Sequence, residues 1–377
     1  MKYLLGLLLI LIFNFNLLSK PVSEENSNLK VGVVIQPLFN ALIFNEDTVN
    51  TKINFLNRRL RLIAQGNLND KINFFFQLGF SPNDFKAVES LDGTPNNPVF
   101  DAYFDYQFNK EAYIRIGQFK LPGNFSRLMS FKNLSFLERS NAENLLKIYR
   151  DIGLLTFNSF EFNDIICNTY FSLTHGEGVN SKTKEDLGLN YTARIEFLPF
   201  GKFSNDNLMA EMDKVGENSI KLLLGSAFNY NENTLRQYST TGKKLLIGKN
   251  IESYFFDILM KYQGLSLFFE YLGKQANNNQ ALNPDSLAFE GYGYSISITY
   301  KLFENNFIGL RFCQYSVDKD IKSALKLEDQ KDFSLSYNYY LLNERLKLQC
   351  EADYIQPNLN TNNSSILKFN LQFVLTY

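Results

Sequence analysis

The last eleven residues alternate between apolar and polar side chains almost without interruption. One face carries only apolar or aromatic side chains: Leu367, Phe369, Leu371, Phe373, Leu375 and Tyr377. The other face carries Lys368, Asn370, Gln372, Val374 and Thr376, of which only Val374 is apolar. Because successive side chains of a β-strand point to opposite faces, the pattern predicts one extended strand with two unlike faces. Its length matches the roughly 9 to 11 residues that a tilted strand needs to cross a lipid bilayer.

The N-terminus has the three-part layout of a secretory signal peptide. Lys2 precedes an apolar run from Tyr3 to Phe15, and a more polar stretch begins near Ser19. We therefore expect a signal peptide at 1–20, with cleavage near 19–23, and a barrel domain at 21–377. An uncleaved membrane anchor is the alternative, but the apolar core is shorter than the roughly 20 residues of a spanning helix. No later stretch is continuously apolar over that length.

Composition excludes several classes of function. The 38 basic and 39 acidic side chains nearly cancel, so no global basic field indicates a nucleic-acid partner. The three cysteines, Cys167, Cys313 and Cys350, are widely spaced, and the single histidine, His175, lies in a polar segment. We therefore expect neither a metal site nor a cofactor, and no catalytic function.

Sixteen segments show strand-like alternation, and an even number suits a closed antiparallel barrel with both chain ends on one side. They lie near 29–39, 52–64, 70–80, 99–107, 111–119, 151–158, 165–174, 186–197, 220–229, 253–261, 265–273, 290–301, 306–315, 331–340, 345–355 and 366–377. Short turns alternate with long polar connections, as in outer-membrane barrels with short periplasmic turns and long external loops. The exception is 198–219, which is long and charged where a short turn is due. We predict a periplasmic excursion there, partly helical. A soluble two-sheet sandwich is the competing fold.

A group of motifs resembles the phosphate-selective porin O and P family. The motifs are Tyr113-Ile-Arg-Ile-Gly-Gln-Phe-Lys-Leu-Pro122, Phe136-Leu-Glu-Arg-Ser140 and Arg150-Asp-Ile-Gly153, with weaker echoes at Arg58-Arg-Leu-Arg-Leu62 and Thr174-His-Gly-Glu-Gly178. Gly123 and the absence of Trp depart from the family pattern. The resemblance implies an all-β transmembrane antiparallel barrel of sixteen strands, commonly trimeric, with the third external loop folded inward.

The residues of segment 120–150 favour the same inward fold. It is the longest connection, and it carries many apolar side chains that need burial: Leu121, Phe125, Leu128, Phe131, Leu134, Phe136, Leu137, Leu145, Leu146 and Ile148. Packing against the inner wall of the barrel would bury them. Packing on other external loops, or on another subunit, is the alternative.

The same segment is rich in positive charge. Its basic residues are Lys120, Arg127, Lys132, Arg139, Lys147 and Arg150, against only Glu138 and Glu143. A narrow pore of low dielectric constant would focus this charge on passing anions. Further candidates on the lumen wall are Arg59, Arg61, Arg115, Arg194, Arg311 and Arg345. For each wall arginine the alternative is a salt bridge, with Glu196, Glu351 or Asp353 as partners.

The sequence therefore predicts an outer-membrane porin through which small anions diffuse passively. Phosphate selectivity stays open at this point, and the expected partners are small anions, outer-membrane lipid and two further copies of the chain. The alternatives are a surface adhesin or receptor barrel, and a general or sugar diffusion porin. An outer-membrane lipid hydrolase would need a nucleophile beside a base, and no serine motif with a histidine is present.

Overall fold

The computed structural model describes residues 28–45, 50–89, 97–181, 188–278, 283–342, 345–357 and 365–377. The expected signal peptide at 1–20 lies outside the described residues. The strands are β1 (Asn28–Asn45), β2 (Asn50–Asn69), β3 (Ile72–Gly79), β4 (Val99–Gln107), β5 (Ala112–Lys120), β6 (Arg150–Phe162), β7 (Ile165–Thr174), β8 (Asn190–Leu198), β9 (Lys221–Arg236), β10 (Lys244–Tyr262), β11 (Leu265–Ala276), β12 (Gly291–Phe303), β13 (Asn306–Val317), β14 (Gln330–Leu341), β15 (Leu346–Pro357) and β16 (Ser365–Thr376). The helices are α2 (Pro82–Ala87), α3 (Phe125–Leu128), η3 (Phe131–Asn133), α4 (Asn141–Leu146), η4 (Ser204–Met209), η5 (Pro284–Ser286) and α5 (Lys319–Leu325).

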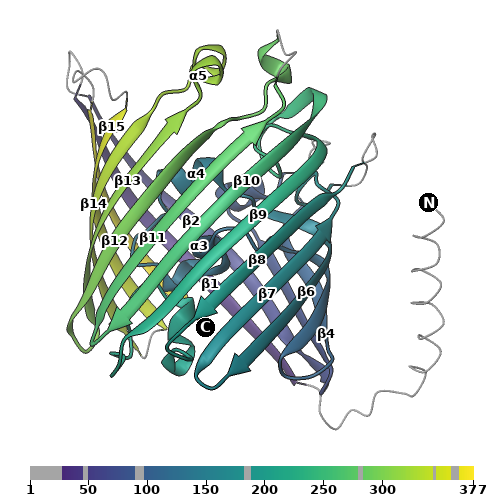
Figure 1. Ribbon diagram of the computed structural model, residues 1–377. Helices are drawn as coiled ribbons and strands as arrows, with labels where there is room; N and C mark the ends of the chain where they lie inside the picture. The colour runs from purple at the N-terminus through teal and green to yellow at the C-terminus, as the bar shows by residue number, and fades with distance from the viewer. Residues whose placement is uncertain are drawn as a thin grey trace, which may run out of the picture.

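All sixteen strands form one closed antiparallel barrel, as predicted (Figure 1). Each strand pairs with its neighbours in sequence, and β16 closes the ring by pairing with β1 and β15. Closure leaves no sheet edge, so every strand has two partners for its backbone hydrogen bonds. Among the described residues no helix is both long enough and apolar enough to cross a membrane.

The two faces of the strands differ in polarity, as the alternation in residues 367–377 predicted. Leu367, Phe369 and Leu371 are exposed on the outside of the barrel, whereas Asn370 and Gln372 are buried toward its interior. The same alternation occurs on β15. An apolar outer surface of this kind is stable in lipid, where no water competes.

Several strands extend further than the alternation indicated. The predicted connection 230–252 shrinks to 237–243, because β9 continues to Arg236 and β10 begins at Lys244. The extension of β9 carries polar residues on both faces, whereas that of β10 mixes Leu245, Leu246 and Ile247 with polar residues without regular alternation. Outside the hydrocarbon region a strand keeps its backbone ladder without needing an apolar face.

The connection between β5 and β6, residues 121–149, folds into the barrel, which confirms the inward-folded third loop. We call it the inner loop. Figure 1 shows its helices α3 and α4 inside the barrel, whereas α5 lies at the end that carries the long loops. Leu121, Phe125, Leu146 and Ile148 are at most 1 % exposed. They pack among inward-facing side chains of β9, β10 and β11, such as Leu259.

Side chains of the wall also bind the backbone at the start of the inner loop. Arg194 of β8 donates to the Gly123 carbonyl at 2.6 Å. Asp257 of β10 accepts from the Phe125 N–H at 2.9 Å, and Glu270 of β11 accepts from the next N–H, that of Ser126, at 2.7 Å. The short helices of the loop leave these groups without helical partners, so the wall supplies them.

The middle of the inner loop is bound in the same way from the strands that follow. Lys347 Nζ donates to the Leu134 carbonyl at 2.5 Å, and Glu351 accepts from the Leu137 N–H at 2.6 Å. Arg311 donates to the carbonyl of the residue after Leu137 at 2.7 Å. Most of these bonds fix the loop to the wall of β8 to β15, and Arg58 of β2 adds one bond to the Leu137 carbonyl at 2.7 Å. The open space lies on the side of β1 to β8.

The segment between β8 and β9 corrects the prediction of a periplasmic excursion. Residues 199–220, which we call the inner turn, contain η4 but fold back into the barrel. Lys261 of β10 is fully buried, and its Nζ donates to the Ala210 and Met212 carbonyls at 2.8 Å each. Glu211 accepts from the Ser135 N–H of the inner loop at 2.8 Å. The charges that suggested a solvated segment are instead partners of buried backbone groups.

We predict that Lys261→Met loosens the inner turn. The change leaves buried carbonyls without donors and should destabilise the folded barrel by about 2–3 kcal/mol. The temperature at which the folded form loses its faster migration on gels should fall, and limited proteolysis should cut 199–220 more readily.

The matched control is Lys221→Met, because Lys221 donates to one carbonyl of the same segment, Phe200, in an exposed bond. Equal thermal midpoints and equal proteolysis for the two variants would contradict the role of Lys261.

Candidate functional site

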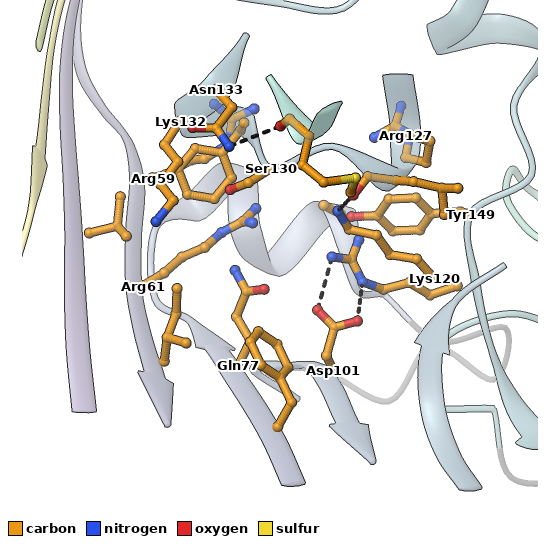
Figure 2. Close-up of a pocket in the computed structure, with 18 of the residues that line it drawn as sticks. Arg59, Arg61, Gln77, Asp101, Lys120, Arg127, Ser130, Lys132, Asn133 and Tyr149 are labelled. Carbon is orange, nitrogen blue, oxygen red and sulfur yellow. Dashed lines mark hydrogen bonds and ion pairs between the residues drawn. The ribbon is translucent and has the colours of Figure 1, made fainter. Parts of the chain in front are cut away.

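The interior of the barrel holds a cavity of about 1400 Å³ that reaches both ends. At the end with the long loops it is lined by Lys86 and Thr241, and at the end with the short turns by Lys30 and Tyr377. One side of the cavity is the inward face of β1 to β8, and the other is the inner loop. Figure 2 shows Arg61 and Lys120 extending toward this space from opposite sides. The arrangement is that of a continuous, off-centre path through the barrel.

The described residues that line the cavity are strongly biased toward positive charge. Twelve are basic: Lys30, Arg58, Arg59, Arg61, Lys86, Arg115, Lys120, Arg127, Lys132, Arg139, Lys147 and Arg150. Four are acidic: Asp84, Asp101, Glu138 and Glu196. Since the whole chain is almost neutral, the fold has gathered cations along the path.

All six basic residues predicted from segment 120–150 lie on this cavity, but two of them are paired with carboxylates. Arg150 binds Asp101 through two hydrogen bonds of 2.9 and 3.0 Å. Arg127 binds Glu143 at 2.5 Å. Burial alone would raise the pKa of the Glu143 carboxyl, but Arg127, together with Lys147 and Arg139, outweighs burial and lowers that pKa. Glu143 is therefore ionised and neutralises part of the charge.

The other four are not held by carboxylates. Lys120 Nζ donates to the carbonyls of Leu128 and Met129 at 3.1 Å each, and Arg139 donates to Met129 and Ser126 at 2.8 Å each. One carbonyl oxygen, that of Met129, thus holds two cations.

The remaining two are bound more weakly. Lys147 donates to the Asn144 carbonyl at 2.8 Å, and Lys132 is exposed, with no ion pair or side-chain hydrogen bond among the described residues. Carbonyl groups fix the position of a cation without cancelling its charge. These four residues, one at the end of β5 and three in the inner loop, keep this part of the path positive.

Strand β2 contributes three arginines, one more than the sequence predicted. Arg59 and Arg61 lie on the cavity as expected, and Arg58 lies there too. A break in the β1–β2 register at Gln36 and Pro37 causes this, because it places two successive residues toward the lumen. The residue in the sequence that indicates this break is Pro37, because its backbone nitrogen has no hydrogen to donate to the neighbouring strand.

The β2 arginines share few acidic partners. Glu138 of the inner loop pairs with Arg58 and lies 3.6 Å from Arg59. Arg61 pairs with Asp84 of α2 at 2.8 Å. One carboxylate therefore serves both Arg58 and Arg59, and the wall keeps an excess of positive charge.

The other predicted wall arginines have different surroundings. Arg115 lines the cavity and binds Asp105 through two hydrogen bonds of 2.7 and 2.9 Å. Arg194 is enclosed by Glu196 at 2.8 Å and Asp257 at 2.6 Å. It anchors the inner loop and does not line the path.

The last two predicted wall arginines also lie off the path. Arg311 holds the inner loop and lies over the ring of Phe136 at 4.2 Å. The placement of Arg345 on the lumen wall was wrong. It precedes β15 in an exposed turn, with its guanidinium 5.8 Å from the ring centre of Tyr377.

Solved structures with the same architecture are outer-membrane proteins. OprB of Pseudomonas putida matches with a TM-score of 0.61 and 11 % identity, over 93 % of this chain and 94 % of that chain. The outer membrane channel DcaP of Acinetobacter baumannii matches with a TM-score of 0.57 and 11 % identity, over 96 % of this chain and 100 % of that chain. OmpT of Vibrio cholerae, in its trimer form, matches with a TM-score of 0.56 and 10 % identity, over 93 % and 100 %. At this identity the likeness concerns the fold alone.

Sequence comparison identifies the family. An uncharacterized protein of Aquifex aeolicus (strain VF5) is 25 % identical over 366 residues, which cover 87 % of this chain and 82 % of that protein. The family model for phosphate-selective porin O and P matches residues 35–365, which is most of the chain and nearly the whole barrel. The chain therefore belongs to the phosphate-selective porin O and P family, and it is an outer-membrane porin, a channel and not an enzyme.

Proposed function

We propose that this porin lets small anions diffuse passively across the outer membrane, with the inner loop as the constriction. The proposal rests mainly on the lining of the cavity, which contains twelve basic residues and only four acidic ones. Water in the path is confined between walls of low dielectric constant, which strengthens the field of these charges.

The proposed constriction comprises Lys120, Lys132, Arg139 and Lys147, the cations that no carboxylate neutralises. Arg127 and Arg150, the other two cations of the segment, have carboxylate partners, and we assign them mainly to holding the loop in place. A lysine ammonium offers a point charge with three mobile donors, which suits release of an anion as well as its capture.

Further cations extend the path on both sides of the constriction. Lys86 lies at the extracellular mouth, Arg59 and Arg61 lie on the opposite wall, and Lys30 lies at the periplasmic exit. Conduction requires several weak binding sites and not a single tight one. The family name makes phosphate the first anion to test. The chemistry agrees, because one guanidinium group can bind two phosphate oxygens at once.

We also propose that the mature protein begins after a signal peptide at 1–20 and assembles as a homotrimer. The proposal for the trimer is supported by the trimeric form of OmpT, which shares the fold. The apolar outer surface of each barrel is compatible with either lipid or a neighbouring barrel as its contact.

The selectivity of the pore is directly measurable. We predict that the purified protein in planar bilayers produces stepwise conductance, and that its reversal potential in a KCl gradient has the sign of chloride selectivity. Added phosphate should reduce the chloride current by competing for the same cations. Cation selectivity, or no conductance at all, would refute the proposed function.

The constriction residues can be tested by neutralisation. In Lys120→Gln/Arg139→Gln the carbonyl of Met129 no longer holds two positive charges. A unit charge about 4 Å from an ion in water contributes about 1 kcal/mol, so each substitution should lower the anion-to-cation permeability ratio about fivefold.

The control for that variant is Lys71→Gln, because Lys71 is exposed in the turn between β2 and β3 and does not line the cavity. It should keep the native reversal potential. An unchanged reversal potential in the double variant would contradict the proposed role of Lys120 and Arg139 and would assign anion selectivity to the arginines of β2 instead.

A further inference from the structure

Five aromatic side chains form a belt in the periplasmic half of the barrel wall, and all but Phe157 line the cavity. Its members are Phe75 of β3, Tyr103 of β4, Tyr113 of β5, Phe157 of β6 and Tyr170 of β7, one from each of five adjacent strands. Phe75 and Tyr103 stack with ring centres 5.4 Å apart and planes at 20°. Tyr113 and Phe157 stack at 4.9 Å and 25°, and Phe157 contacts Tyr170 at 4.9 Å.

Arg115 joins the two stacked groups into one surface. Its guanidinium lies 3.8 Å from the ring centre of Tyr103 and 5.5 Å from that of Tyr113. The carboxylate of Asp105 holds the guanidinium in this orientation. A continuous surface of rings with one cation among them therefore runs along the wall.

Four rings of the belt reach the path, although Tyr103, Tyr113 and Phe157 also pack against a buried apolar cluster of the wall and the inner loop. Phe75, Tyr103, Tyr113 and Tyr170 all line the same cavity as Lys120. Each of them is only partly buried. Rings that served only to pack the wall would be covered by the inner loop, as Phe268 of β11 is covered by Phe125. An inorganic anion cannot stack on the rings themselves, because it has no apolar face.

Polar groups accompany the rings. The Tyr170 hydroxyl donates to Glu196 at 3.2 Å, and the Asn168 amide donates to the same carboxylate at 3.2 Å. Glu196 and Asn168 also line the cavity. Flat apolar surfaces flanked by hydrogen-bonding groups match a sugar ring, which has an apolar face of C–H groups and an edge of hydroxyls.

We propose that the aromatic belt is a track for sugar phosphates, so that the porin favours phosphate esters of sugars over inorganic phosphate. The proposal rests on the proposed anion channel, in which the constriction attracts the phosphate group. The sugar ring then moves along the stacked rings, and Arg115 meets the phosphate again on the periplasmic side. Neutral sugars lack the charge that the constriction attracts.

The test compares three solutes on the full-length porin in planar bilayers: glucose 6-phosphate, inorganic phosphate and glucose. We expect glucose 6-phosphate to halve the chloride current at a concentration about fivefold below that of phosphate, as contact with one or two aromatic rings would give. Glucose should have no measurable effect. In Tyr103→Leu/Tyr113→Leu the advantage of glucose 6-phosphate should disappear, while the block by phosphate stays the same.

Phe104→Leu is the matched control, because Phe104 lies on the same strand as Tyr103 but is exposed on the outer face. It should retain the preference for glucose 6-phosphate. If the double variant does not fold, as judged by the loss of heat-modifiable migration on gels, the single variants Tyr113→Leu and Tyr170→Leu are tested instead. Each should lose part of the preference.

The outcomes separate this proposal from the anion channel. An anion-selective native porin that binds glucose 6-phosphate no better than phosphate overturns the sugar-phosphate track alone. So does an unchanged preference in the folded tyrosine variants. A reversal potential of the opposite sign refutes the anion channel itself.

Discussion

The structure depends on how the inner loop obtains partners for its backbone. A loop of short helices inside a barrel exposes many N–H and C=O groups, and each one left unpaired away from water is costly. Here Asp257, Glu270 and Glu351 accept from its N–H groups, while Arg194 and Lys347 donate to its carbonyls. Charged residues of the wall thus bind the loop backbone at successive positions along the loop. Their positions fix which half of the lumen is filled and which half stays open.

The same division explains the electrostatics of the path. Carboxylates of β10, β11 and β15 are used on the filled side, where they bind loop backbone. The open side of the lumen keeps the arginines of β2 and Lys120 at the end of β5, and the inner loop adds Arg139. Carbonyl oxygens of the loop hold both Lys120 and Arg139. A nearly neutral chain therefore surrounds a positive cavity, because its acidic residues are concentrated elsewhere in the barrel.

Much of the fold could be predicted, since strands in a barrel wall obey local rules. The sixteen alternating segments, the two unlike faces of 367–377 and the inward position of 120–150 could all be predicted from the pattern of apolar residues. The pattern failed where its physical basis ends. Beyond the hydrocarbon region β9 and β10 continue without a regular alternation of apolar and polar residues. Much of the charged segment 198–219 is buried, and Lys261 and Glu211 bind backbone groups there.

The site was predictable in composition but not in pairing. The sequence indicated which segment carries excess positive charge, and the cavity holds all six of its basic residues. It could not distinguish Arg150, bound to Asp101, from Lys120, bound only to carbonyls, because these partners come from other strands or from backbone positions. The position of Arg58 in the lumen could not be predicted, because a bulge opposite Pro37 places it there. The aromatic belt could not be predicted because its rings come from five different strands.

The sequence by itself determined the barrel, its strand number and the inward loop, because alternation and burial depend on the order of side chains along one strand. Tertiary structure alone decided which cations stay unneutralised, which arginines serve as clamps, and which rings meet to form a surface. These are contacts between residues far apart in the chain. Their partners follow from the register and curvature of the closed sheet, which no local pattern encodes.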